Sequence, residues 1–139
     1  MSKDVCQKRG ADYYDYSKYE VKFGHQSEYE IIDRIGWGKF ADVFQGIDSK
    51  TDKDVAIKIL KPVQKNKIRR EVKIMQILNN GPNIITFIDI VWDPATKTPA
   101  IVTEYVNCLN PLKVWNEMKL EEVKFYLFEL LKAIDHVHS

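Results

Sequence analysis

The feature that most constrains the fold is a glycine pair between two strand-like segments. Gly36 and Gly38 lie in the run Gly-Trp-Gly-Lys-Phe-Ala-Asp-Val at 36–43. Residues 29–35 precede this run and residues 43–47 follow it, and both segments have the apolar and β-branched residues typical of strands. A dinucleotide-binding glycine loop would lead from a strand into a helix instead. We therefore expect a hairpin whose tip can approach a ligand closely, although a tight turn without a ligand also explains a glycine pair.

The next segments alternate between strand and helix patterns. After a turn at 48–53, residues 55–60 are rich in β-branched residues and predict a third strand. Apolar residues then recur at helical spacing before the stop at 79–82, at Ile68, Val72, Met75 and Leu78. Residues 84–91 and 99–105 predict two further strands. The order of three strands, a helix and two strands predicts an α+β fold.

The two ends of the chain have different patterns. Residues 1–28 form a polar arm, in which closely spaced tyrosines are expected to pack on the folded body: Tyr13, Tyr14, Tyr16 and Tyr19. A connector is expected at 107–111. A second amphipathic helix is expected from the spacing of Val123, Leu127, Leu130, Ile134 and Val137. No helix stop precedes Ser139, so we expect a domain that is cut short there.

Composition excludes several classes of function. A hydrophobic content of 45% and a charged content of 29% are typical of globular domains, and a net charge of +1 gives no argument for nucleic acid or membrane binding. Cys6 and Cys108 form neither a disulfide framework nor a metal pattern, and His25, His136 and His138 lack metal-ligand spacing. The start has no secretory signal, and no apolar run is long enough to span a bilayer. We expect a cytoplasmic or nuclear protein.

Lys58 places a charge inside the apolar strand at 55–60. Alternation puts Ala56, Lys58 and Leu60 on one face, where a buried ammonium would need a partner. Glu71 on the following helix can supply a carboxylate. The alternatives are an edge lysine with its ammonium in water and a solvated helix carboxylate. The order of glycine hairpin, strand lysine and helix glutamate favours the pair.

These parts resemble the nucleotide-binding lobe of protein kinases. Specific stretches resemble the catalytic (alpha) subunit of casein kinase 2, a protein Ser/Thr kinase that prefers acidic substrates: residues 58–63, 69–71, 81–85, 14–16 and 23–26. The resemblance implies a kinase N-lobe at 29–106, with a five-stranded antiparallel sheet and one helix. It also implies an N-terminal arm at 1–28, and the hinge exit and first helix of a truncated C-lobe at 107–139.

The same resemblance implies a site for ATP or GTP. From the adenine side to the phosphates, its residues would be Ile35, Val43, Ala56, Ile85, Thr103, Glu104, Val106, Gly36, Gly38, Lys39 and Lys58. Thr103 would be the gatekeeper, and Glu71 would hold Lys58 against the α- and β-phosphates. Ala41 replaces the third glycine of the kinase pattern, which predicts a stiffer loop. The family usually has a bulkier aromatic residue at Thr103 and asparagine at Cys108.

The basic run at 61–73 has three interpretations. It can be a solvated helix face, or a nucleic-acid or nuclear-import patch, which the net charge of +1 disfavours. The resemblance implies a patch for acidic protein substrates, formed by Lys65, Lys67, Arg69 and Arg70.

The sequence contains none of the H-R-D, D-F-G and A-P-E motifs that carry the catalytic Asp, the magnesium ligands and the activation segment. We therefore expect magnesium to act only in a complete kinase, and the chain alone to be inactive. The alternative is a non-catalytic module or decoy that binds the regulatory beta subunit. The resemblance implies its contacts at Ile31, Phe44, Ile59, Ala95 and Val102.

Overall fold

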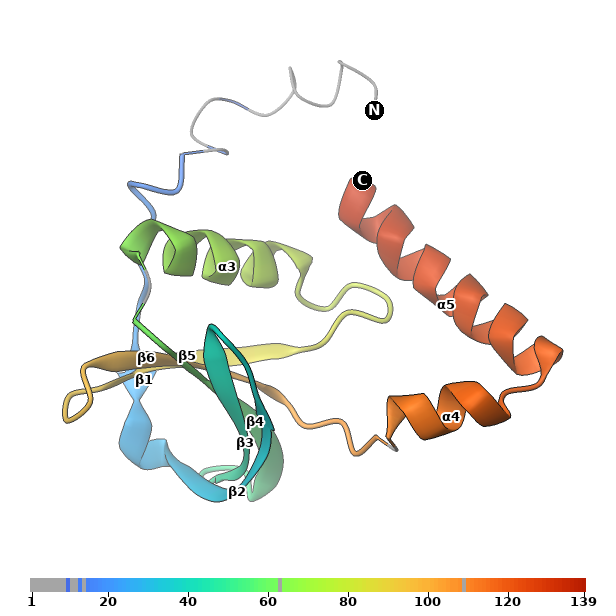
Figure 1. The fold of residues 1–139 in the computed structure, drawn as a ribbon. Helices are drawn as coiled ribbons and strands as arrows, with labels where there is room; N and C mark the ends of the chain where they lie inside the picture. The colour runs from blue at the N-terminus through green and yellow to red at the C-terminus, as the bar shows by residue number, and fades with distance from the viewer. Residues whose placement is uncertain (1–9, 11–12, 14, 63, 109) are drawn as a thin grey trace.

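The computed structural model describes residues 10, 13, 15–62, 64–108 and 110–139. A six-stranded sheet lies beneath one helix, and two further helices extend to one side of it (Figure 1). Along the chain the elements are β1 (Gly24–His25), the 3-10 helix η1 (Gln26–Glu28), β2 (Tyr29–Trp37), β3 (Ala41–Asp48), β4 (Lys53–Leu60), α3 (Lys65–Leu78), β5 (Phe87–Asp93), β6 (Thr98–Glu104), α4 (Pro111–Glu117) and α5 (Leu120–His138). The expected α+β fold class is confirmed.

The sheet has one strand more than the sequence predicts. Its order is β1-β5-β6-β4-β3-β2, and β1 pairs in parallel with β5 while the other pairs are antiparallel. The extra strand comes from the arm, at a position where the chain passes close to β5. A Cβ atom on Gly24 would collide with the Asp89 carboxylate, so a larger residue there would force that side chain to move. A strand of two residues has no alternating pattern, which is why the sequence does not reveal it.

The helix α4 was also not predicted. Asn110 caps it, because its side-chain oxygen accepts a hydrogen bond from the Leu112 amide at 3.0 Å, and Pro111 occupies the first turn. Asparagine followed by proline is a helix-start signal, so the connector expected at 107–111 ends at Asn110, where the helix begins. The predicted strand at 84–91 begins later, at Phe87. The Asn79 side chain bonds both the Phe87 amide (2.9 Å) and its carbonyl (3.0 Å), which fixes the turn before β5.

Strand β4 separates two apolar layers. Between the sheet and α3 lie Ala41, Leu60, Val72, Phe87, Ile90 and Ile101. On the opposite face lie Val55, Ile57, Val91, Ala100 and Val102. Leu60 and Ile57 therefore point in opposite directions, as the alternation of β4 predicts. Val72 is completely buried, and it anchors α3 to the sheet.

The arm packs against the outer side of α3. The Lys73 ammonium lies over the rings of Tyr13, Tyr16 and Tyr19, at 5.6, 5.4 and 5.8 Å from their centroids. The hydroxyl of Tyr19 also donates to the Gln76 side chain. Packing of the arm tyrosines on the body is thus seen for these three, while Tyr14 lies outside the described residues. Each contact combines a cation with an aromatic face, and together they tie the arm to the helix.

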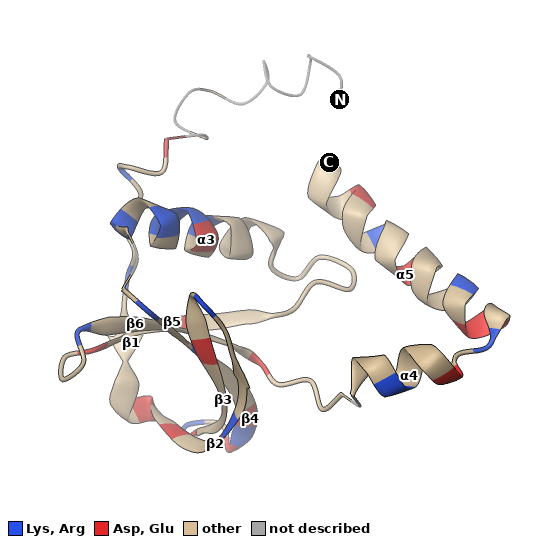
Figure 2. Ribbon diagram, viewed as in Figure 1, with Lys and Arg blue, Asp and Glu red and all other residues tan. Residues whose placement is uncertain are grey.

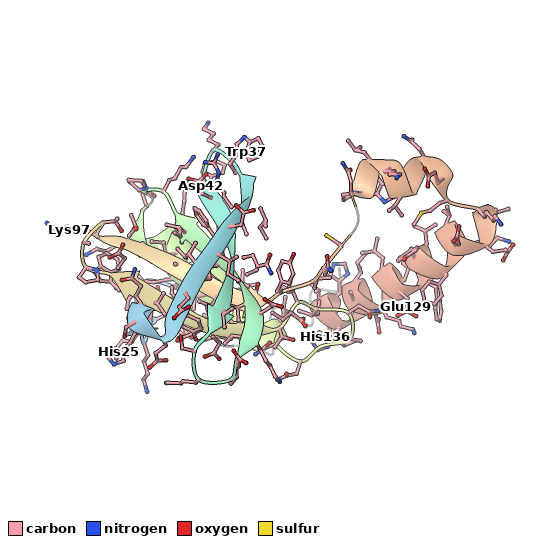
Figure 3. The ribbon with its side chains drawn as sticks, turned by 90° about the horizontal axis from the view of Figure 1, so that it is seen from below. His25, Trp37, Asp42, Lys97, Glu129 and His136 are labelled. Carbon is pink, nitrogen blue, oxygen red and sulfur yellow. The ribbon has the colours of Figure 1, made fainter. Side chains whose placement is uncertain are left out.

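Helix α5 touches the body at the loop between α3 and β5. The Asn83 amide donates to the Glu129 carbonyl at 3.0 Å and to its carboxylate at 2.6 Å, and the His136 ring lies beside Gly81. Figure 3 labels Glu129 and His136 on this side of the molecule. Most apolar side chains of the helix remain exposed, including Leu120, Phe125, Leu127, Phe128 and Leu131. Among the described residues, no helix has the length and apolarity needed to cross a membrane.

The exposed apolar side chains of α5 predict self-association of the 139-residue chain. Contiguous apolar patches of this kind drive association in water. Static light scattering should show a mean mass that rises with concentration in the micromolar range. Replacement of Phe125 and Phe128 by glutamate should lower that mass toward the monomer. A wild-type chain that stays monomeric at high micromolar concentration would contradict this prediction.

Asp48 makes stability depend on pH. Its carboxylate accepts hydrogen bonds from the Lys50 amide (2.9 Å) and the Thr51 hydroxyl (2.8 Å), and these bonds lower its pKa from the ordinary 3.8. Because the unfolded chain binds the proton more readily, Asp48 stabilises the fold above that value. This contribution is lost as the pH falls through the lowered pKa.

We expect the melting temperature of Asp48→Asn to fall less than that of the wild type between about pH 5 and pH 3. Asp52→Asn is the matched control, since the Asp52 amide closes the same turn onto the Asp48 carbonyl and the Asp52 side chain makes no hydrogen bond to another described residue. Thermal unfolding followed by circular dichroism measures all three. Equal slopes for the wild type and Asp48→Asn would contradict the prediction.

Candidate functional site

The site is organised by an ion pair between β4 and α3. The Lys58 ammonium donates to the Glu71 carboxylate, and both side chains are a little more than one-third exposed. A pair with this exposure contributes about 0–1 kcal/mol to folding. Its main effect is therefore to fix the position of the Lys58 ammonium rather than to stabilise the fold.

The strand pairing aligns Lys58 with the glycine hairpin. Gly36 pairs with Val43 across β2 and β3, and Val43 pairs with Lys58 across β3 and β4. One row of the sheet therefore leads from a glycine to the paired lysine. In a parallel row, Ala56 pairs with Thr103 of β6. Because directly paired residues share a face, these residues line the face of the sheet that carries Lys58.

The tip of the hairpin is a tight turn with open space beside its glycines. The Gly38 amide donates to the Ala41 carbonyl at 2.9 Å, and the Lys61 ammonium donates to the Gly38 carbonyl at 2.7 Å. A Cβ atom on Gly36 or Gly38 would make only ordinary contacts, at 3.7 and 3.6 Å. Neither glycine has a positive φ, so this conformation does not itself require glycine. The space beside the backbone is thus available to a ligand.

Ala41 has a role in packing that the sequence does not reveal. Ala41 is 8% exposed and belongs to the apolar layer beneath α3, together with Leu60. No residue of the turn has a positive φ, so Ala41 loses no conformational freedom relative to glycine here, and this conformation gives no reason for a stiffer loop. Figure 3 shows Trp37 and Asp42 at the same end of the sheet, on either side of the turn.

The residues assigned to adenine lie along a more open edge. Ile35, Ile85 and Val106 are each about half exposed, and none belongs to an apolar core cluster. The end of β6 is held to the chain before β5, because the Thr86 amide donates to the Glu104 carboxylate (2.7 Å) and the Glu104 amide to the Thr86 carbonyl (3.0 Å). The Glu104 side chain is thus used within the protein. Lys39 stands apart at the tip, where it covers the Phe40 ring.

A cavity of about 510 Å³ lies beside the ion pair, between α3 and the hairpin. Its lining contains Lys58 and Glu71, but none of the residues assigned to adenine. The other lining residues are Phe40, Leu60, Lys67, Ile68, Arg70, Ile74 and Met75. Of these, five apolar residues were not predicted at the site: Phe40, Leu60, Ile68, Ile74 and Met75. Phe40 is 63% exposed and lies in the glycine-rich run. A large apolar side chain at an exposed hairpin tip is a sequence signal that could have placed Phe40 at the site.

The basic residues of α3 are divided between two faces of the helix. Lys67 and Arg70 line the cavity beside Lys58, while Lys65 and Arg69 line a separate groove next to the arm. Figure 2 shows the basic bands in the N-terminal half of α3. Lys67 and Arg70 also line a smaller hollow with Asp15, Tyr16 and Ser17 of the arm, so the four residues assigned to acidic substrates lie around the N-terminal half of the helix. Only Lys67 and Arg70 share the Lys58 side.

The residues assigned to a beta-subunit contact differ in accessibility. Ile31 and Ala95 are exposed, and Phe44 and Ile59 are half-buried on the sheet face away from α3. Val102 is completely buried in that layer, so it is not accessible to a partner in this conformation. In the described part of the chain, no three histidine, cysteine or acidic side chains gather as a metal site would require.

Comparison with protein families agrees with this architecture. The family model described as protein kinase domain matches residues 29–139, from the first residue of β2 to the residue after α5. The matched region contains the glycine hairpin, the lysine–glutamate pair and the strands that align them. The chain belongs to the protein kinase family.

Proposed function

We propose that this chain is the ATP-binding portion of a protein Ser/Thr kinase of the casein kinase 2 type, which phosphorylates acidic sites. The observation that carries the proposal is the ion-paired Lys58 in one strand row with Gly36. A lysine held by a helix glutamate beside a glycine hairpin is the phosphate-binding arrangement of protein kinases. GTP fits the same contacts, because the phosphates are shared by both nucleotides.

The residues present suit a nucleotide triphosphate. The hairpin leaves space at Gly36 and Gly38 for close approach of phosphate oxygens, and Lys58 supplies a positive charge whose position Glu71 fixes. The exposed apolar side chains of Ile35, Ile85 and Val106 offer surface for an adenine ring. Protein kinases use ATP together with magnesium, which neutralises charge on the phosphates.

The preference for acidic substrates is supported by charge beside the site. Lys67 and Arg70 are both exposed, and they line the cavity that contains Lys58. Two cations at this place would attract acidic side chains near a phosphorylated serine or threonine. The casein kinase 2 assignment itself rests on the sequence resemblance at 58–63 and 81–85. A cytoplasmic or nuclear location belongs to the same proposal.

A second candidate function is a non-catalytic module that binds the regulatory beta subunit. Its support is the apolar side chain of Ile31, which is 51% exposed beside the half-buried Phe44 and Ile59. This face of the sheet lies away from α3 and the ion pair, so both functions can coexist on one chain. Pull-down with a purified beta subunit, compared between wild type and Ile31→Glu, separates this candidate from nucleotide binding.

Replacement of Lys58 by alanine should weaken ATP binding more than adenosine binding, because the ammonium meets only phosphates. We expect ATP affinity in the millimolar range for the wild-type chain, or about 4–6 kcal/mol of binding free energy. Loss of one charge-assisted contact should weaken ATP roughly tenfold and leave adenosine within about twofold. Titration calorimetry or ligand-observed NMR measures both ligands.

Lys53→Ala is the matched control for this experiment, since Lys53 is an exposed lysine of the same strand that does not line the cavity beside Lys58. It should affect ATP less than Lys58→Ala does. Equal weakening of ATP and adenosine by Lys58→Ala would remove Lys58 from the phosphate role. The glycine hairpin would then be an ordinary turn.

A further inference from the structure

The tip of the hairpin between β2 and β3 exposes two large aromatic rings. Trp37 is 78% exposed and Phe40 is 63% exposed, and neither belongs to the apolar layers on the two faces of the sheet. Trp37 is the most exposed of the large apolar side chains in the described part of the chain. Large apolar side chains that gather on a surface mark places where a protein meets a partner or a membrane. The tip is therefore a candidate interaction site.

The two rings lie on opposite sides of the tip. Trp37 pairs with Asp42 across the hairpin, and Asp42 pairs with Ile59, whose side chain packs in the layer away from α3. Directly paired residues share a face, so Trp37 lies on the side away from α3. Phe40 lines the cavity beside Lys58, on the α3 side. The tip is thus a wedge with an aromatic ring on each flank, at the end of the sheet where Figure 3 labels Trp37.

Each ring has a cation beside it. The Arg34 guanidinium lies 5.4 Å from the centre of the indole ring, and the Lys39 ammonium lies 5.6 Å from the centre of the phenyl ring. Both basic side chains are exposed, and neither forms an ion pair with a carboxylate of the described residues. The Asp42 carboxylate is already paired with the Lys61 ammonium, at 3.6 Å. The tip therefore has an excess of positive charge, which the whole-chain net charge of +1 does not reveal.

This combination of rings and cations suits the surface of a bilayer. Aromatic rings settle in the headgroup region of a membrane, and basic side chains beside them meet anionic lipids. A single-stranded nucleic acid is less suited, because it binds along a groove in which rings stack successive bases, and the two rings here face opposite sides. A nucleotide beside Lys58 would not meet Trp37, which lies on the other face of the sheet. The bilayer surface is the ligand that uses both rings and both cations.

We propose that the hairpin tip inserts end-on into the surface of a membrane that contains anionic phospholipid. Trp37 and Phe40 would enter the headgroup region, and Arg34 and Lys39 would pair with lipid phosphates and carboxylates. The exposed apolar side chains of α5 do not offer the same site. That helix carries four carboxylates against two lysines, so anionic lipid would repel it.

The first test measures co-sedimentation of the 139-residue chain with vesicles of phosphatidylcholine, with and without about 30 mol% phosphatidylserine. We expect the wild-type chain to bind the anionic vesicles at least about tenfold more tightly. Trp37→Ala with Phe40→Ala should weaken that binding about tenfold, because both rings are lost. The matched control is Trp115→Ala with Phe125→Ala, which removes the same residue types, 66% and 58% exposed, from α4 and α5. It should bind within about twofold of the wild type.

A second pair of variants tests the charges. Arg34→Gln with Lys39→Gln should weaken binding to the anionic vesicles at least about tenfold and leave binding to phosphatidylcholine unchanged. Lys53→Gln with Lys97→Gln makes the same change in net charge at exposed positions away from the tip. It should bind nearly as tightly as the wild type. Circular dichroism checks that all four double variants stay folded.

Tryptophan fluorescence locates the inserted segment. The chain has three tryptophans, so Trp92→Phe with Trp115→Phe leaves Trp37 as the single emitter. Its emission should shift to shorter wavelength on the anionic vesicles, and brominated lipid should quench it. A chain that keeps only Trp115 should show neither change.

Several outcomes would overturn the proposal. The wild-type chain could show no preference for anionic vesicles, or the tip variants could lose no more binding than their matched controls. The Trp37 emission could also stay unchanged on vesicles that bind the protein, which would place the tip in water. A labelled single-stranded oligonucleotide is the competing ligand. If it binds and both tip variants lose it, while phosphatidylserine does not strengthen vesicle binding, the tip binds nucleic acid and the membrane proposal is wrong.

Discussion

The ion pair between Lys58 and Glu71 is the interaction on which the site depends. It joins the central strand β4 to α3, so the position of the Lys58 ammonium is set by how the helix packs. Val72, the next residue along α3, is completely buried against the sheet. Burial of the residue beside Glu71 fixes the rotation of the helix and thereby directs the carboxylate toward Lys58. The packing of the apolar layer therefore determines both how firmly α3 is held and where the Lys58 ammonium lies.

The arm extends this dependence to the N-terminal part of the chain. Tyr13, Tyr16 and Tyr19 surround Lys73 on the outer side of α3, and β1 adds the arm to the sheet beside β5. The helix is thus held from both sides, by the sheet beneath it and by the arm. The groove that contains Lys65 and Arg69 lies where the arm, α3 and the sheet edge meet.

Much of this arrangement could be predicted from local patterns. The alternation of apolar residues at 55–60 predicted which face of the sheet carries Lys58. The spacing of Ile68, Val72 and Met75 predicted the side of α3 that packs on the sheet. β1 could not be predicted, because two residues show no periodicity and the pairing with β5 is long-range. The cavity beside Lys58 also depends on tertiary packing, since Phe40 reaches it from the hairpin. The division of the basic run between two faces follows from helical geometry, but requires the helix start at Lys65 to be known.

The central claim is that Glu71 holds Lys58 where it meets nucleotide phosphates. Phosphorus-31 NMR of ATP, titrated with the wild-type chain and with Glu71→Gln, tests it directly. The account predicts that the wild type shifts the α- and β-phosphate signals, and that Glu71→Gln reduces these shifts. Saturation transfer to the adenine protons should persist in both proteins. Equal phosphate shifts for the wild type and Glu71→Gln would contradict the account.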